Sequence, residues 1–96
     1  MKKRRFGSVW DAIEGNAREA ANLRARSELM IALQQRLRAN KLTQARAAKL
    51  LGVTQPRVSN LMRGKIELFS LETLIDMLTR VGARVKLSVH FDKRAA

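Results

Sequence analysis

Residues 42–65 read LTQARAAKLLGVTQPRVSNLMRGK, a pattern that predicts two short helices joined by a glycine turn. Thr43 and Thr54 are suitable N-cap residues, so a helix is expected to begin directly after each of them. Gly52 falls between the two helices, where a tight turn needs the positive φ that glycine adopts readily. Pro56 lies in the first turn of the second helix, where a missing N–H breaks no helical hydrogen bond. The expected helices span residues 44–51 and 55–62.

The apolar residues of this pattern fall where two crossing helices would pack against each other and against a core. They are Ala47, Ala48, Leu51, Val53, Val58 and Leu61. The remaining positions form an outward face whose eight residues are all polar or basic: Gln44, Arg46, Gln55, Arg57, Ser59, Asn60, Arg63 and Lys65. The pattern therefore predicts a helix-turn-helix. The alternative is a pair of ordinary core helices with a solvated basic face.

The charge around this pattern is entirely positive. Between Leu29 and Ile66 the chain has no Asp or Glu, and it has eight basic residues: Arg36, Arg38, Lys41, Arg46, Lys49, Arg57, Arg63 and Lys65. The whole chain carries a net charge of +12, which favours anionic polymers or anionic membrane surfaces. A positive field around a helix-turn-helix pattern points to duplex DNA, whose phosphates supply most of the attraction.

The expected DNA contacts follow if the second helix lies in the major groove with its first turns toward the base edges. Gln55 can bond adenine through both polar ends of its amide, and Arg57 can fork onto O6 and N7 of guanine. Ser59 and Asn60 could reach a base edge or a phosphate. The expected phosphate contacts are Gln44, Arg46, Thr54, Arg63 and Lys65.

Further helices are expected on both sides of this pattern. Two capping-box signatures near the N-terminus predict a short helix over residues 9–14, a break at Gly15, and a long helix over residues 17–39. Ser70 opens a last helix, which is expected to end near Gly82.

The period of the sequence changes after this last helix. From Arg84 to Phe91, apolar and polar residues alternate, which predicts a half-buried strand. A single strand needs a partner for its N–H and C=O groups. The simplest source is the same strand of a second copy, paired antiparallel across a two-fold axis. The expected dimerisation residues are Val85, Leu87, Val89 and Phe91.

The 96 residues make one small domain, which we expect to be all-α apart from this one strand. We divide the chain into five segments: a basic tail (1–8), a helical extension (9–28), a helix-turn-helix domain (29–82), a dimerisation strand (83–92) and a tail (93–96).

Composition disfavours several other classes of protein. The chain has no cysteine and one histidine, and no group of residues has catalytic or metal-ligand spacing, so we expect no enzyme activity, cofactor or metal. No apolar run approaches the roughly 18 residues of a membrane-spanning helix. The basic start lacks the apolar region of a signal peptide, so a cytoplasmic, nucleoid-associated location is expected. RNA binding is disfavoured because aromatic residues for base stacking are few.

The segments LTQ, AAKLLGV, TQPRVSNL and RGK within residues 42–65 resemble the helix-turn-helix of the xenobiotic-response-element (XRE) family, the Cro/cI-repressor type of bacterial and phage regulators. The resemblance implies a five-helix, lambda-repressor-like bundle over residues 29–82. It also implies that Gln55 reads a base, that Gln44 meets a phosphate, and that Arg57 and Asn60 face the groove. Pro56 departs from relatives that place a polar reader at that position.

The VWDAIE segment from Val9 to Glu14, the long helix and the closing strand together resemble HigA-like antitoxins and related stand-alone regulators. Members of that branch repress their own operon as dimers and neutralise a toxin, usually a RelE/HigB-like ribonuclease. The leading expectation is thus a dimeric, sequence-specific repressor on a palindromic operator; the alternative is an antitoxin that mainly binds a toxin. If a toxin binds, the expected contact is the first 28 residues, which hold four of the eight acids: Asp11, Glu14, Glu19 and Glu28.

Overall fold

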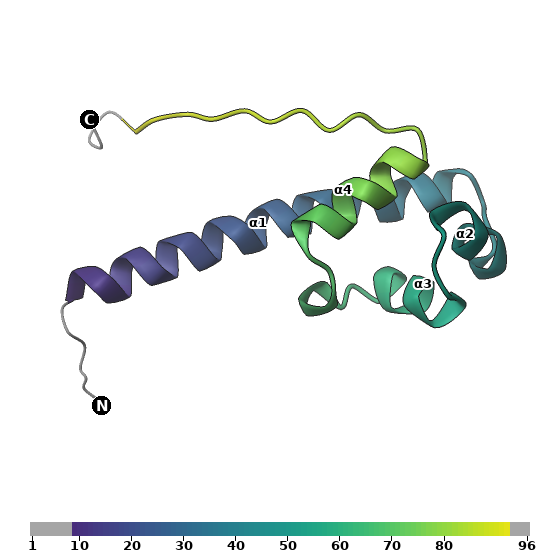
Figure 1. Ribbon diagram of the computed structural model, residues 1–96, viewed down its shortest axis with the longest axis horizontal. Helices are drawn as coiled ribbons and strands as arrows, with labels where there is room; N and C mark the ends of the chain where they lie inside the picture. Colours follow the sequence, from purple (N-terminus) through teal and green to yellow (C-terminus); the bar gives the residue numbers. More distant parts are fainter. Residues whose placement is uncertain (1–8, 93–96) are drawn as a thin grey trace.

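The computed structural model describes the backbone of residues 9–92 and the side chains of residues 16–92. Four α-helices and one 3-10 turn follow one another: α1 (Val9–Ala39), α2 (Gln44–Leu51), α3 (Gln55–Met62), η1 (Ile66–Leu68) and α4 (Leu71–Arg80). Helices α2, α3 and α4 gather around the C-terminal half of α1, and the N-terminal half of α1 extends beyond them (Figure 1). The described part is therefore all-α, as the sequence predicted.

The predicted break in the N-terminal helix is wrong. The short helix and the long helix are one continuous α1 of 31 residues, which runs through Gly15. Glycine inside a helix costs only about 1 kcal/mol relative to alanine. A break would leave the carbonyl and N–H groups of two new helix ends without helical partners, so the continuous helix is the less costly solution.

The core lies where the C-terminal half of α1 meets the other helices. Met30, Leu33 and Leu37 of α1 are spaced three and four residues apart, so they form one stripe, and all three are buried. They belong to a cluster with buried residues of the other elements: Ala47, Ala48, Leu51, Val58, Leu61, Phe69, Leu74, Met77 and Leu78. This cluster clamps α2, α3 and α4 onto α1.

The predicted starts of α2, α3 and α4 are confirmed. The side-chain oxygens of Thr43, Thr54 and Ser70 each accept a hydrogen bond from a backbone N–H three residues on. The donors are Arg46 (3.2 Å), Arg57 (3.3 Å) and Thr73 (3.1 Å). These bonds occupy N–H groups that have no partner within their own helix.

The four α-helices end in the same way, with a left-handed residue just beyond the helix. After α2, α3 and α4 this residue is a glycine, at positions 52, 64 and 82. After α1 it is Lys41, with a φ of 53°. The turn there is closed by hydrogen bonds from Lys41 N to Arg38 O (3.0 Å) and from Leu42 N to Leu37 O (3.3 Å). Lys41 thus adopts a conformation that its Cβ disfavours.

The C-terminal segment, residues 83–92, forms no strand within the described part of the chain. Ala83 and Val85 pack against the core, whereas Leu87, Val89 and Phe91 are 87%, 75% and 88% exposed. The segment runs back along the direction of α1 with no other extended segment beside it (Figure 1). A strand is defined by its hydrogen bonds to a second strand, and residues 9–92 of a single copy supply no second strand.

The expected five-helix bundle needs a similar correction. Between residues 29 and 82 the structure has the end of α1, the helices α2, α3 and α4, and the 3-10 turn η1 in place of a fifth α-helix. Gly64 accounts for this, because its φ of 74° turns the chain directly after α3. Only the three residues Ile66–Leu68 then remain helical before the cap at Ser70.

We predict that Lys41→Gly stabilises the protein. Relief of the left-handed strain outweighs the added freedom of the unfolded chain by about 1 kcal/mol. For a domain of this size that corresponds to a rise of about 4–8 °C in the midpoint of thermal unfolding. The matched control is Lys41→Ala, which removes the same charge but keeps a Cβ. Equal midpoints for the two variants, measured by circular dichroism, would show that the φ of residue 41 is not strained in solution.

Candidate nucleic-acid interface

The turn between α2 and α3 is fixed by local hydrogen bonds and by burial. Gly52 has φ 70° and ψ 34°, and the turn is closed by bonds from Gly52 N to Lys49 O (3.3 Å) and from Val53 N to Ala48 O (3.0 Å). Ala48 is buried where the helices approach. This combination of a small residue, a glycine and two caps is what the sequence predicted for a helix-turn-helix.

Helix α3 has one buried side and one accessible side. Val58 and Leu61 are completely buried, whereas Gln55 is exposed and Ser59 and Asn60 are half-buried. The predicted phosphate contacts Gln44, Arg46, Thr54, Arg63 and Lys65 are all exposed. Among the described residues, Gln55 is thus open to solvent, and Ser59 and Asn60 are partly accessible on the same helix.

The structure brings part of the predicted site together around one hollow. A cavity of about 440 Å³ between α2 and α3 is lined by Ala45, Arg46, Ala48, Lys49, Val53 and Gln55. The predicted phosphate contact Arg46 and the predicted base reader Gln55 therefore border the same depression. Lys49, which was counted only in the basic stretch, lies there as well.

Helices α2 and α3 contribute no carboxylate to this surface, because residues 30–65 contain no Asp or Glu. The ion pair between Arg80 Nε and Asp76 Oδ2 (3.2 Å) lies on α4, outside α2 and α3. The accessible side of the helix-turn-helix therefore has basic groups, neutral polar groups and a few apolar groups, but no carboxylate from residues 30–65. Such a surface attracts a polyanion over its whole extent.

Within the described residues, the predicted base reader Arg57 is held by side-chain contacts to its own chain. Its Nη1 donates a hydrogen bond to Leu68 O at 2.9 Å. Its Cζ lies 4.1 Å from the centroid of the Phe69 ring. The side chain is half-buried, so the structure places it against the segment between α3 and α4.

Two further residues, both of α1, hold this region: Gln34 bonds the C-terminal end of α3, and Arg26 bonds the segment that follows α3. Gln34 Nε2 donates to Leu61 O at 2.8 Å, and Arg26 Nη1 donates to Ile66 O at 3.2 Å. The partners lie 27 and 40 residues apart in the sequence. The sequence analysis missed them because no local pattern marks a side chain that bonds a distant carbonyl.

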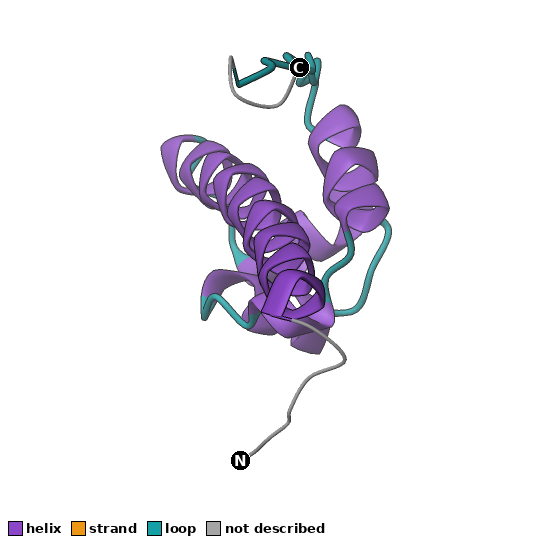
Figure 2. Ribbon diagram, turned by 90° about the vertical axis from the view of Figure 1, so that its left-hand side faces the viewer, coloured by secondary structure: helices purple, strands orange, loops and turns teal. Residues whose placement is uncertain are grey.

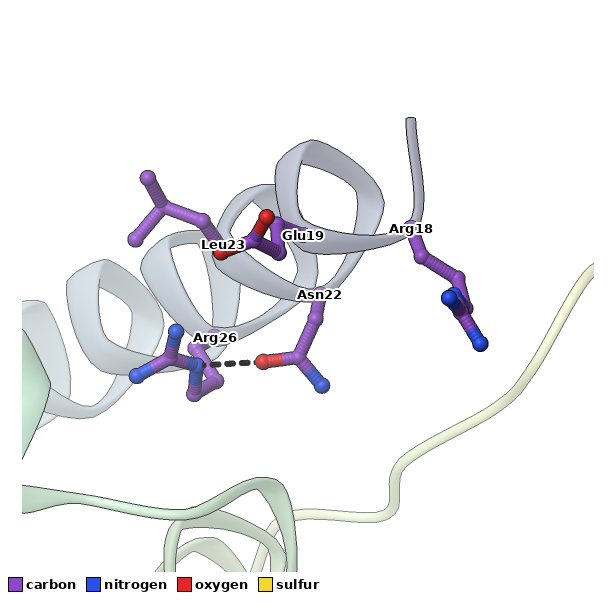
Figure 3. Close-up of a pocket in the computed structure, with 5 residues that line it drawn as sticks. All are labelled: Arg18, Glu19, Asn22, Leu23 and Arg26. Atoms are coloured by element: carbon purple, nitrogen blue, oxygen red, sulfur yellow. Dashed lines mark hydrogen bonds between the residues drawn. The ribbon is translucent and has the colours of Figure 1, made fainter. Parts of the chain in front are cut away.

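The hollow drawn in Figure 3 lies apart from this interface. Its lining residues Arg18, Glu19, Asn22, Leu23 and Arg26 all come from α1, and Asn22 Oδ1 accepts a hydrogen bond from Arg26 Nε at 2.7 Å. A hollow lined by one helix face is a surface depression. No group of three or more His, Cys, Asp or Glu residues suited to a metal ion occurs among the described residues.

Comparison with known proteins identifies the class. The family model described as "Helix-turn-helix domain" matches residues 14–90, which include the whole site described above. A solved structure described as an XRE family transcriptional regulator is 32% identical, with a TM-score of 0.72 over 81% of this chain and 88% of that chain. No curated protein matches this chain.

The chain therefore belongs to the helix-turn-helix family and resembles its XRE-type transcriptional regulators across most of its length. This confirms the predicted DNA-binding domain, and it confirms that the protein is not an enzyme, because the family is a non-enzymatic one. None of the described helices is both long and apolar enough to traverse a lipid bilayer.

We predict that two equivalent caps differ in their effect on DNA binding. Thr43→Ala and Thr54→Ala should each cost about 1 kcal/mol of unfolding free energy, since each removes one cap. Only the Thr54 hydroxyl is expected to meet a phosphate, so Thr54→Ala should also weaken DNA binding by roughly two- to tenfold. Binding is measured by fluorescence anisotropy at a temperature where both variants are folded. Equal affinity losses would contradict a phosphate contact at Thr54.

Proposed function

We propose that this protein is a sequence-specific DNA-binding repressor that acts as a dimer on a palindromic operator. One observation carries the proposal: α3 is fixed to the core by Val58 and Leu61 and leaves Gln55, Ser59 and Asn60 accessible. A recognition helix needs this division between an anchored side and a reading side.

In the proposed complex α3 lies in the major groove with its N-terminal turns toward the base edges. The amide of Gln55 pairs with adenine, and Ser59 and Asn60 reach base edges further along. Contacts to the DNA backbone come from exposed residues at the rim of this face: Gln44, Arg46, Thr54, Arg63 and Lys65. The backbone contacts set the register, and the base contacts set the sequence.

The proposed dimer forms through the C-terminal segment. Leu87 and Val89 are apolar and exposed in the single chain, as expected for a surface that a second copy covers. This segment lies on the upper side of the molecule in Figures 1 and 2, whereas α3 lies on the lower side in Figure 1. Antiparallel pairing of two such segments therefore leaves both recognition helices free. Two helices related by a two-fold axis would meet half-sites about 34 Å apart.

The second candidate function is that of an antitoxin, with repression as feedback. The part of α1 that extends beyond the bundle supports it, because the apolar Leu23 is exposed there, and the charged Arg18, Glu19 and Arg24 are exposed on the same part. A projecting helix with an exposed apolar residue among charges of both signs offers a surface to a protein partner. Co-expression with the product of a neighbouring gene tests this candidate. A stable complex that is lost in Leu23→Ser would support it, and failure to co-purify would count against it.

Selection of bound duplexes from a random library tests the proposed function. We expect the wild-type protein to enrich an inverted repeat with half-sites one helical turn or a multiple apart. Gln55→Ala should cost roughly 1–3 kcal/mol on the enriched site and should blur one base position.

Lys65→Ala serves as the matched comparison for Gln55→Ala. It should weaken binding to specific and random DNA alike and should lower the salt slope by about one unit. A library with no enriched sequence would reject the repressor function, and equal behaviour of the two variants would reject Gln55 as a base reader.

The dimer prediction is tested separately from DNA. Leu87→Ser combined with Val89→Ser should lower the dimer fraction, because these side chains lie on the apolar face of the alternating segment. Ser88→Ala combined with His90→Ala changes the opposite face and should leave the dimer intact. Sedimentation velocity measures both pairs. An unchanged sedimentation coefficient in the Leu87/Val89 variant would exclude this segment as the dimer contact.

A further inference from the structure

We infer that Arg57 is a positioning residue that holds the recognition helix from inside the protein instead of reading a base. The inference rests on the proposed function, because it takes α3 as the helix that enters the groove. Two contacts carry it: the hydrogen bond from Arg57 Nη1 to Leu68 O at 2.9 Å and the stacking of Cζ 4.1 Å from the Phe69 ring centroid.

The stacking links Arg57 to the core, because Phe69 is a buried core residue. Its side chain is 1% exposed and is among the largest completely buried side chains in the protein. It belongs to the same core cluster as Leu33, Leu61 and Leu74. The guanidinium of Arg57 therefore lies against a ring that is itself fixed in the core, and a cation over an aromatic face is attracted to it.

The two ends of α3 are then held independently. Arg57 lies in the first turn of α3 and ties it to residues 68 and 69, ahead of α4. At the other end, Gln34 of α1 donates to Leu61 O at 2.8 Å. Helix α3 has only eight residues, so tethers at both ends set its tilt in the groove. Its tilt in turn sets where Gln55, Ser59 and Asn60 point.

A base-reading role would require Arg57 to abandon both contacts. The carbonyl of Leu68 would lose its hydrogen bond from the guanidinium, and the Phe69 ring would lose its contact with the guanidinium on one face. The hydrogen bond to Leu68 O is exposed, so the stacking on the buried Phe69 ring is the costlier of the two contacts to lose. Gln55, by contrast, is exposed at the N-terminus of the same helix and can reach DNA without this loss.

The decisive comparison pairs Arg57→Ala with Phe69→Leu. Leucine keeps the core apolar but removes the ring, and Phe69 is too deeply buried to touch DNA. Each variant, and the double variant, is measured for thermal unfolding, for affinity at a temperature where all are folded, and for base preference by library selection. Arg63→Ala, which removes an exposed positive charge from the end of α3, is the charge-matched control.

We expect Arg57→Ala to weaken specific binding by roughly tenfold while the same base stays preferred at every position of the site. Phe69→Leu should reproduce part of this loss, and the double variant should bind no more weakly than Arg57→Ala alone, because both remove one contact. Arg63→Ala should weaken specific and random DNA to the same extent. That set of results supports the inference.

Two results would overturn it. Loss of preference at a single base pair in Arg57→Ala, with normal binding by Phe69→Leu, would make Arg57 a direct reader. A lower unfolding midpoint with unchanged DNA binding by the folded variants would make the contact a matter of stability alone. If the wild-type protein enriches no sequence, the proposed function is rejected, and this inference with it. That result is distinct from the two results above, because they are measured on variants and it is measured on the unaltered protein.

Discussion

The fold depends on the packing of one apolar stripe of α1 against the rest of the chain. Helices α2 and α3 have eight residues each, and isolated helices shorter than about 12–15 residues are marginal in water. Met30, Leu33 and Leu37 supply the surface on which these short helices are buried. Without that stripe, the caps and the glycine turn would define local conformations but no stable helix-turn-helix.

The same packing connects the core to the DNA-facing surface. Gln34 of α1 bonds Leu61 O near the end of α3, and the segment that follows α3 is bonded by Arg26 of α1 and by Arg57 of α3. All three bonds end on main-chain carbonyls, so they hold the path of the chain and not one particular side chain. The orientation of α3 is therefore set jointly by apolar burial on its inner side and by these polar tethers at its ends.

The features that the sequence predicted well are those that depend on neighbouring residues. The caps at Thr43, Thr54 and Ser70, the left-handed Gly52 and the buried Val58 each follow from chemistry within about four positions. A continuous α1 was not predicted, because a glycine is a weak helix breaker whose effect depends on its surroundings.

The remaining differences involve distant or intermolecular partners. The contact between Arg57 and Phe69 joins residues from separate elements, and polarity alone makes Arg57 look free to read a base. The alternation of residues 84–91 predicts a strand, but no hydrogen-bond ladder forms among the described residues of one copy. Whether Gln55, Ser59 and Asn60 meet bases depends on a DNA molecule, so those assignments stay predictions.

One consequence of the long α1 is that the free energy needed to open its backbone hydrogen bonds differs between its two halves. Residues 30–37 include its core stripe, whereas residues 16–24 are exposed throughout. Backbone amides open with free energies that follow local burial, so hydrogen exchange along α1 should slow progressively toward its C-terminal half. Within α1, a cellular protease would therefore cleave the projecting part more readily than the part that carries the core stripe, and cleavage there would leave the core stripe joined to α2, α3 and α4.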